Sequence, residues 1–289
     1  MKLIYQYWDG YLRTDHTLGS EVMKRYADRI GADYIFEHNP NFLRNFFKCS
    51  VESRHLAEGG ADYVTAYLGA LKPLFAPEYD KYDTILFVDL DVFPSEHLYD
   101  SIFDELGDAE IGIVPEFYDH PMPEHLKDQI REWESRLKRV GIDLPQYKDL
   151  PIALNSGVVL YSKKARLRAR KENWFDLEQY IKLVDNIDPY FFTDQPYLNY
   201  MFFHQDVDLK YLDQKWNGHM FTQIRGYEDG TIVEVEHFDR RTPETNFTHF
   251  RCERAEQLTN DQILRIVRTN DWPEEFTSGN YLKKIPKNA

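Results

Sequence analysis

The sequence is poor in cysteine and has no long hydrophobic run. Only Cys49 and Cys252 occur among 289 residues, and their spacing fits no metal-binding motif. Two distant cysteines favour a reducing compartment and no disulfide. A transmembrane helix needs about 18 or more consecutive apolar residues, and no such stretch is present. The first residues also become polar too quickly for a signal peptide. We therefore expect a cytoplasmic protein.

Positive charge is also scarce. Lys and Arg total 35 against 49 Asp and Glu, which gives a net charge of −14. Nucleic acids and acidic membranes attract clustered positive charge, so we expect neither as a partner. A phosphate-bearing ligand stays compatible with this charge if a metal ion and a few local cations neutralise it. The apolar fraction of 42% is ample for a folded core. Composition does not determine the oligomeric state.

The most informative stretch is 83–93, where an apolar run leads into two aspartates. Residues 85–88 are apolar, and Asp89 and Asp91 follow at alternate positions. Such a run predicts a buried strand of a parallel sheet, with both carboxylates on the same side. Two carboxylates without a neighbouring Lys or Arg repel each other unless a divalent cation joins them. We expect a metal or phosphate site at the carboxyl end of this strand, with a purely structural pair as the alternative.

The rest of the chain predicts alternating strands and helices. Strand 3–8, a helix capped by Ser20 and strand 33–37 form a β-α-β unit that favours a parallel sheet. The loop 10–19 then occupies the usual position of a nucleotide-binding loop. Helices are predicted at 61–75, 123–140 and 197–201, and strands at 110–115, 151–161, 209–216, 230–236 and 246–251.

Two polar motifs interrupt this pattern. Asn155-Ser156-Gly157 breaks the strand 151–161 and predicts either a backbone that passes close to a ligand or a simple bulge. Asp206 and Asp208 form a second Asp-x-Asp pair, but it follows polar residues and predicts a solvated turn.

The ordered motifs resemble those of the GT-A glycosyltransferases, in the group that includes glycogenin and the bacterial lipooligosaccharide galactosyltransferases. The matching elements are Lys72, Phe87-Val88-Asp89-Leu90-Asp91, Asn155-Ser156-Gly157-Val158, Asp194-Gln195 and His249. The resemblance implies an α/β fold of the GT-A type, with a single Rossmann-like mixed sheet flanked by helices. It implies one domain over 1–289, with a nucleotide-binding half at 1–95, a donor-sugar and acceptor half at 96–255, and a C-terminal helix and tail at 256–289.

The resemblance also implies a reaction. A sugar passes from a nucleotide-diphosphate sugar, with a UDP-sugar as the default, to a glycan, protein or other acceptor. The implied ligands of Mn²⁺ or Mg²⁺ are Asp89, Asp91 and His249. The implied nucleotide-binding residues are Tyr7, Trp8, Asp9, Lys72, Asp89 and Arg251. The implied sugar-binding and catalytic residues are Asn155, Asp194 and Gln195. The family's ending after the histidine is absent here, so Arg251 or Arg254 is only a substitute candidate for its phosphate-binding lysine.

Two alternatives remain open. A haloacid-dehalogenase-type phosphatase also has an apolar strand before Asp-x-Asp, with Asp89 as nucleophile and Asp91 as acid and base around Mg²⁺. That motif usually opens its fold, whereas here a β-α-β unit precedes it. A non-catalytic sugar-nucleotide or glycan-binding module needs the metal pair but neither Asp194 nor the region of His249. A lone histidine is also readily structural.

Overall fold

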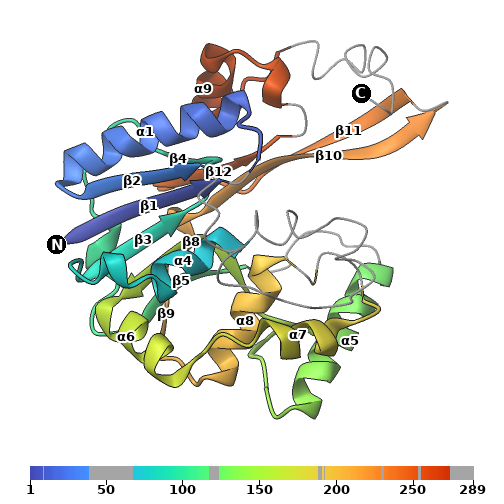
Figure 1. Cartoon of the computed structure of the whole chain (residues 1–289). Coiled ribbons are helices and arrows are strands. Elements are labelled where there is room, and N and C mark those ends of the chain that lie inside the picture. Colours follow the sequence, from blue (N-terminus) through green and yellow to red (C-terminus); the bar gives the residue numbers. More distant parts are fainter. Residues whose placement is uncertain are drawn as a thin grey trace. The chain divides into compact units, whose positions relative to one another are not determined.

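The computed structural model is an α/β protein in which helices flank a mixed sheet (Figure 1). It describes residues 1–8, 10–38, 68–116, 124–187, 191, 193–228, 231–252 and 255–273, without the side chains of 223–228, 231–237 and 256. Asp9, Arg254 and residues 61–67 of the predicted helix 61–75 lie outside the described residues. The chain divides into two compact units: Met1–Gly10, Gly31–Asp89 and Ser101–Leu212 form the first, and Tyr11–Ile30, Leu90–Asp100 and Asp213–Ala289 the second.

The first unit is built on a six-stranded sheet in the order β2-β1-β3-β8-β5-β9. Its strands are β1 (Lys2–Trp8), β2 (Asp33–His38), β3 (Thr84–Val88), β5 (Ile111–Glu116), β8 (Ala153–Ser162) and β9 (Leu209–Tyr211). β1 is parallel to β2 and β3, and β5 is parallel to β9, whereas β8 is antiparallel to both β3 and β5. The predicted mixed sheet is confirmed. The fully parallel surroundings predicted for the acidic strand are wrong, because β8 pairs with β3 in the opposite direction.

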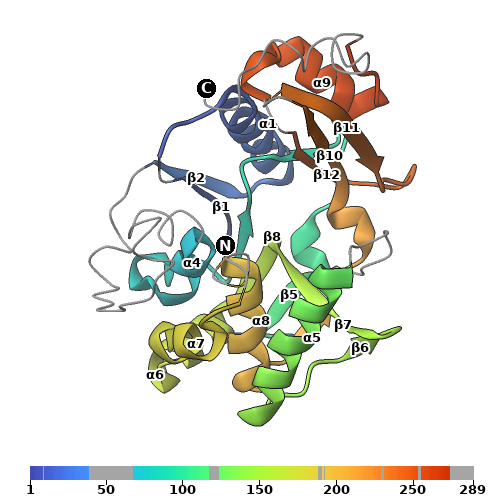
Figure 2. The same ribbon diagram turned by 90° about the vertical axis from the view of Figure 1, so that its right-hand side faces the viewer.

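Helices and short turns cover this sheet. They are η1 (Leu68–Leu71), α4 (Lys72–Phe75), η2 (Pro77–Tyr79), η3 (Ile102–Glu105), α5 (Glu124–Arg139), α6 (Lys163–Glu172), α7 (Leu177–Val184) and α8 (Asp194–His204), with a small hairpin of β6 (Gln146–Tyr147) and β7 (Leu150–Pro151). α8 packs against β8 (Figure 2). Ile130, Trp133 and Leu137 of α5 are buried in the core, which confirms the amphipathic helix predicted at 123–140.

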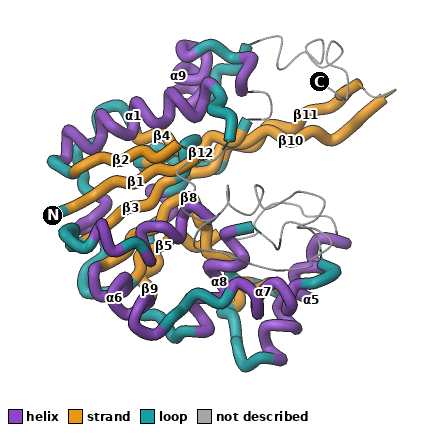
Figure 3. The backbone as a smooth tube through the Cα atoms, in the orientation of Figure 1, coloured by secondary structure: helices purple, strands orange, loops and turns teal. Residues whose placement is uncertain are grey.

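The second unit is built on a four-stranded sheet in the order β11-β10-β12-β4. Its elements are α1 (Thr14–Ile30), β4 (Val92–Pro94), η5 (Gln214–Trp216), β10 (Gly218–Glu228), β11 (Thr231–Asp239), β12 (Phe247–Arg251), η6 (Ala255–Gln257) and α9 (Asn260–Thr269). β10 and β11 form a long antiparallel ribbon (Figure 3). α1 contacts both β4 and α9, and apolar side chains such as Leu18, Phe93 and Ile263 fill the space between these elements.

Two predicted boundaries are wrong. α1 begins at Thr14, so Ser20 lies inside the helix and 10–19 is not an open loop. Gly19 explains the error, since a Cβ there would lie 1.8 Å from the carbonyl oxygen of Leu90. This glycine permits close packing inside a helix rather than marking a turn. The predicted strand 209–216 also ends early, at Tyr211, and gives way to η5.

None of the helices in the described part of the chain is both long and apolar enough to cross a lipid bilayer. The organisation of 1–289 as a single domain stays a prediction.

Candidate metal centre and a polar cluster

Strands β4 and β12 place an aspartate beside a histidine in the second unit. Val92 of β4 pairs with His249 of β12, and the N–H of Phe250 donates to the carbonyl oxygen of Asp91 at 2.7 Å. These backbone contacts hold a carboxylate oxygen of Asp91 3.2 Å from Nε2 of His249. His249 is buried and Asp91 is half-buried, so the pair is largely shielded from solvent.

The charge state of Asp91 suits it to bind a cation. Burial alone would raise the pKa of its carboxyl. The charge of His249 and its hydrogen bond, with further help from His16 and Arg13, outweigh burial and lower the pKa of Asp91 to about 2. Asp91 is therefore a carboxylate at neutral pH.

The other ring nitrogen of His249 is already engaged. Its Nδ1 lies 3.1 Å from Oδ1 of the fully buried Asn217. The ring of His219 stacks on that of His249 with 4.8 Å between centroids and an interplanar angle of 28°. With the amide oxygen of Asn217 facing it, Nδ1 donates, and Nε2 faces the carboxylate of Asp91. Metal-binding histidines are commonly oriented by such a partner on the second nitrogen.

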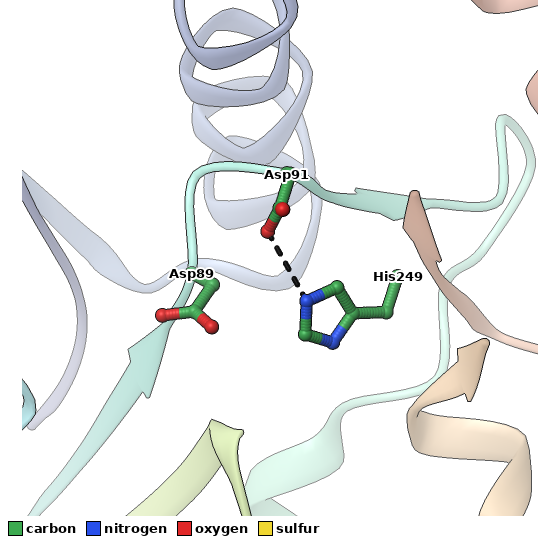
Figure 4. Close-up of side chains that lie close together, drawn as sticks. All are labelled: Asp89, Asp91 and His249. Atoms are coloured by element: carbon green, nitrogen blue, oxygen red, sulfur yellow. Dashed lines mark ion pairs between the residues drawn. The ribbon is translucent and has the colours of Figure 1, made fainter. Parts of the chain in front are cut away.

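Asp89 is joined to this pair by the chain itself, because only Leu90 separates it from Asp91. Its N–H donates to the carbonyl oxygen of Gly157 at 2.9 Å, and its own carbonyl accepts from Nε2 of Gln6 at 3.0 Å. One ligand atom each from Asp89, Asp91 and His249 lies within 4.8 Å of the others (Figure 4).

The predicted convergence of the two aspartates has a different cause from the one expected. β3 ends at Val88 and β4 begins at Val92, so the aspartates are not alternate residues of one strand. The turn between the two strands brings the carboxylates together. Two carboxylates and one oriented imidazole suit Mn²⁺ or Mg²⁺, and the imidazole favours Mn²⁺ over Ca²⁺.

A second polar cluster lies in the first unit, where β5, β8 and α8 meet. Nδ2 of Asn155 donates to Oε1 of Gln195 at 3.2 Å and to Oε2 of Glu116 at 3.4 Å. Nε2 of Gln195 donates to the same oxygen of Glu116 at 2.9 Å. The structure therefore brings the side chains of Asn155 and Gln195 together, while their roles in a sugar site stay predictions.

The backbone at Asn155 is irregular. Ile113 of β5 pairs with Val159, whereas the next residue, Val114, pairs with Asn155. The residues between Asn155 and Val159 therefore bulge out of the β5–β8 ladder. The interpretation of the Asn-Ser-Gly motif as backbone close to a ligand stays a prediction. Oδ1 of Asn155 accepts from the N–H of Gly157 at 2.9 Å and so fixes its own side chain within the bulge.

Glu116 was not predicted as a site residue. It is the last residue of β5, just beyond the predicted strand 110–115. A carboxylate at the carboxyl end of a strand near the acidic strand is the signal that indicates it, since α/β sheets bind ligands at that edge.

Asp194 is the first residue of α8 and is buried, with Thr193 at the N-cap position. The side chain of Thr193 makes no capping bond. Burial raises the pKa of the Tyr161 hydroxyl, and the negative charges of Asp194 and Asp89 raise it further. Both carboxylates thus act on the same buried hydroxyl within the first unit.

The predicted nucleotide-binding residues are more dispersed. Lys72 is buried and forms an ion pair with Glu37, which also accepts from the hydroxyls of Tyr5 and Tyr79 at 2.9 Å each. Tyr7 is buried against Gly69, where a Cβ would lie 2.1 Å from its ring.

Two further candidates lie at strand ends. Trp8 is half-buried at the end of β1, and Arg251 is exposed at the end of β12. The nucleotide-binding roles of these residues, like those of Lys72 and Tyr7, stay predictions.

The fold and the site thus define a mixed α/β protein with a candidate divalent-metal centre. Neither a family model nor a curated protein sequence matches the chain. Several solved structures, in contrast, are similar to the chain. Mouse xyloside xylosyltransferase 1 in its apo form is similar with a TM-score of 0.46 and 15% identity over 76% of this chain and 87% of its own. The galactosyltransferase LgtC, in complex with donor and acceptor sugar analogues, is similar with a TM-score of 0.44 and 15% identity over 96% and 100%.

The glycosyltransferase GlyE of Streptococcus pneumoniae TIGR4 has a TM-score of 0.39 and 13% identity over 100% of this chain and 66% of its own. These structures are those of glycosyltransferases, the class that the sequence motifs indicate. The identities are low, and the functional conclusion therefore comes from the residues of the site.

Proposed function

We propose that the protein is a metal-dependent glycosyltransferase that uses a nucleotide-diphosphate sugar, with a UDP-sugar as the default donor. The observation that carries this proposal is the convergence of Asp89, Asp91 and His249, where β3 ends and β4 begins. The hydrogen-bonded cluster of Asn155, Gln195 and Glu116 supports it, because amides and carboxylates are suitable partners for sugar hydroxyls.

The three ligands would hold Mn²⁺ or Mg²⁺, which supplies positive charge to the diphosphate and so stabilises it as a leaving group. Asp91 contributes a carboxylate that is ionised at neutral pH. Asn217 fixes the ring of His249, so that the imidazole need not be ordered when a ligand binds.

The residues of the polar cluster have complementary roles in the proposal. Asn155 and Gln195 each offer an amide donor and an amide acceptor to sugar hydroxyls. Glu116 accepts from both amides and orients them. Asp194 is the proposed general base, or the carboxylate that stabilises an oxocarbenium-like centre. A glycan or a protein is the proposed acceptor. No observation among the described residues favours the phosphatase or the non-catalytic module.

The test is release of the free nucleoside diphosphate from a panel of nucleotide sugars, with Mn²⁺, with Mg²⁺ and with a chelator. UDP-glucose and UDP-galactose are the first donors, and simple sugars and glycans the first acceptors. We expect turnover of at least one donor with Mn²⁺ and none with the chelator. Asp91→Asn should lose this turnover, because the neutral amide no longer supplies a charged oxygen ligand.

Asp208→Asn is the matched control, since Asp208 is an exposed aspartate of the other Asp-x-Asp pair. It should retain full turnover. Asp194→Asn separates the catalytic role from metal binding, because it should lose turnover while Mn²⁺ binding persists. Failure of every donor, or equal turnover by Asp91→Asn and wild type, would overturn the proposal. Phosphate release from a simple phosphomonoester would favour the phosphatase.

A further inference from the structure

A cavity of about 530 Å³ lies within the second unit. It is lined by one side of α1, by β4 and the residues after it, by the segment between β11 and β12, and by α9. Small-molecule sites in proteins typically occupy about 300–1,000 Å³, so the cavity has the size of a ligand site.

The cavity and the imidazole of His249 are on opposite faces of the sheet. Phe93 and Thr248 are neighbours across β4 and β12, and both line the cavity. Val92 and His249 are the adjacent pair in the same ladder. Since consecutive side chains of a strand point to opposite faces, the imidazole of His249 is directed away from the cavity. The cavity is therefore distinct from the site that would hold the metal.

Arginines dominate the charge of this cavity. Its charged lining residues are Arg25, Arg29, Arg241, Arg268, Glu96 and Asp239. The two carboxylates are already neutralised: Arg268 lies 3.0 Å from Glu96, and Arg241 lies 2.7 Å from Asp239. Four arginines against two carboxylates leave two positive charges, in a chain whose net charge is −14.

The two remaining charges are on α1. Arg25 and Arg29 are four residues apart and therefore share one face of the helix. Within the described part of the chain, neither forms an ion pair with a carboxylate. Arg29 donates instead to the carbonyl oxygens of Leu98 at 3.2 Å and Ser95 at 3.5 Å, which fixes its guanidinium without neutralising it.

A threonine hydroxyl completes the set of donors. Thr248 is only 6% exposed and lines the cavity. Its hydroxyl makes no hydrogen bond to another residue that the structure describes. The hydroxyl is therefore available to donate a hydrogen bond to a molecule in the cavity.

We propose that this cavity is a binding site for a small phosphate monoester. Its dianionic group matches the two charges of Arg25 and Arg29, because guanidinium groups bind phosphate oxygens through paired, charge-assisted hydrogen bonds. Thr248 donates a further hydrogen bond. Binding of the phosphate monoester at this site requires neither sugar transfer nor a metal ion.

The test is isothermal titration of the full chain with inorganic phosphate and with glycerol 3-phosphate, at constant ionic strength and in the presence of a chelator. We expect saturable binding of both probes. Arg25→Gln should weaken it about tenfold or more, the usual effect of losing a charge-assisted hydrogen bond. Lys24→Gln is the matched control, because Lys24 is exposed, adjacent to Arg25 on α1 and not part of the cavity lining.

Thr248→Val removes the hydroxyl at nearly constant shape and should also weaken binding. Asp91→Asn should bind both probes as wild type does, which distinguishes this site from the metal centre. Absence of saturable binding by the wild type, or equal affinities of Arg25→Gln and Lys24→Gln, would overturn the proposal. Arg25 is exposed and bonds no carboxylate in the described structure, so its replacement leaves the fold intact and the test decisive.

Discussion

At the scale of single residues, the candidate metal centre depends on how His249 is oriented. Asp91 faces one ring nitrogen and Asn217 the other, at 3.2 Å and 3.1 Å. Asn217 is completely buried, and its carboxamide has no contact with solvent. It therefore sets the tautomer and the orientation of the imidazole before any ligand arrives.

Replacement of Asn217 by Ala should weaken Mn²⁺ binding about 10- to 100-fold, the usual effect of losing the partner of a metal-binding histidine. Asn217→Asp keeps an acceptor oxygen opposite Nδ1 and should retain most of the affinity. Titration followed by electron paramagnetic resonance of free Mn²⁺ measures both. Asn260→Ala, at an exposed position of α9, is the control. Unchanged Mn²⁺ affinity in Asn217→Ala would show that His249 is not a ligand oriented in this way.

The residues of the site were predictable to different extents. Asp89, Asp91 and His249 were recognisable because their residue types and their order along the chain match a known motif, and the structure places them together. Asn217 carries no such signal, because it acquires its role from His249, a neighbour distant along the chain, and Glu116 is indicated only by its position at the end of a strand. Lys72 is the opposite case. Its position in the sequence suggested a nucleotide-binding role, but its side chain is buried in an ion pair with Glu37.

At the scale of elements, the type of each segment was easier to predict than its bounds. The central strand, the amphipathic helix α5 and the late strand β12 occur where their hydrophobic periods indicate. The start of α1 was missed, because Gly19 disfavours a helix by local propensity. Only the contact with the carbonyl of Leu90 explains the glycine, and that contact is not visible in the local sequence.

Gly19→Ala tests this explanation. In an unconstrained helix the change to Ala would stabilise the fold by roughly 0.5–1 kcal/mol. Here the new Cβ would meet backbone at 1.8 Å, so α1 or the β3–β4 turn must shift. We expect the free energy of unfolding to fall by about 1–3 kcal/mol, as for overpacking in a core.

Urea denaturation measures this change, with Lys24→Ala on the exposed side of α1 as the control, which should be neutral or slightly stabilising. A Gly19→Ala protein that is more stable than wild type would show that α1 does not pack closely against Leu90.

At the scale of the whole molecule, the fold class was predictable and the topology was not. Alternating strand and helix patterns indicate an α/β protein, whereas the insertion of β8 between β3 and β5 depends on pairings between distant segments. The sequence also does not reveal that β3 and β4 belong to different sheets. β4 follows β3 after a short turn, and yet it pairs with β12. Local pattern records the period of a strand but not its partner.

Net charge gives a related lesson. A chain of −14 indicates no general affinity for phosphates, and the positive charge is instead local. The arginine-lined cavity of the second unit and the carboxylate-rich metal centre would bind anions in two different ways. One uses guanidinium groups directly, and the other would use a cation held by Asp89, Asp91 and His249.

The most direct test of the proposed function is the dependence of UDP binding on Mn²⁺. Calorimetric titration of the wild type should show UDP binding with Mn²⁺ present and little or none with a chelator. Asp91→Asn should abolish the Mn²⁺-dependent part, while Asp208→Asn should bind as the wild type does. If UDP binds equally well with and without Mn²⁺, or if Asp91→Asn and wild type are indistinguishable, the acidic turn is not a nucleotide-diphosphate metal site.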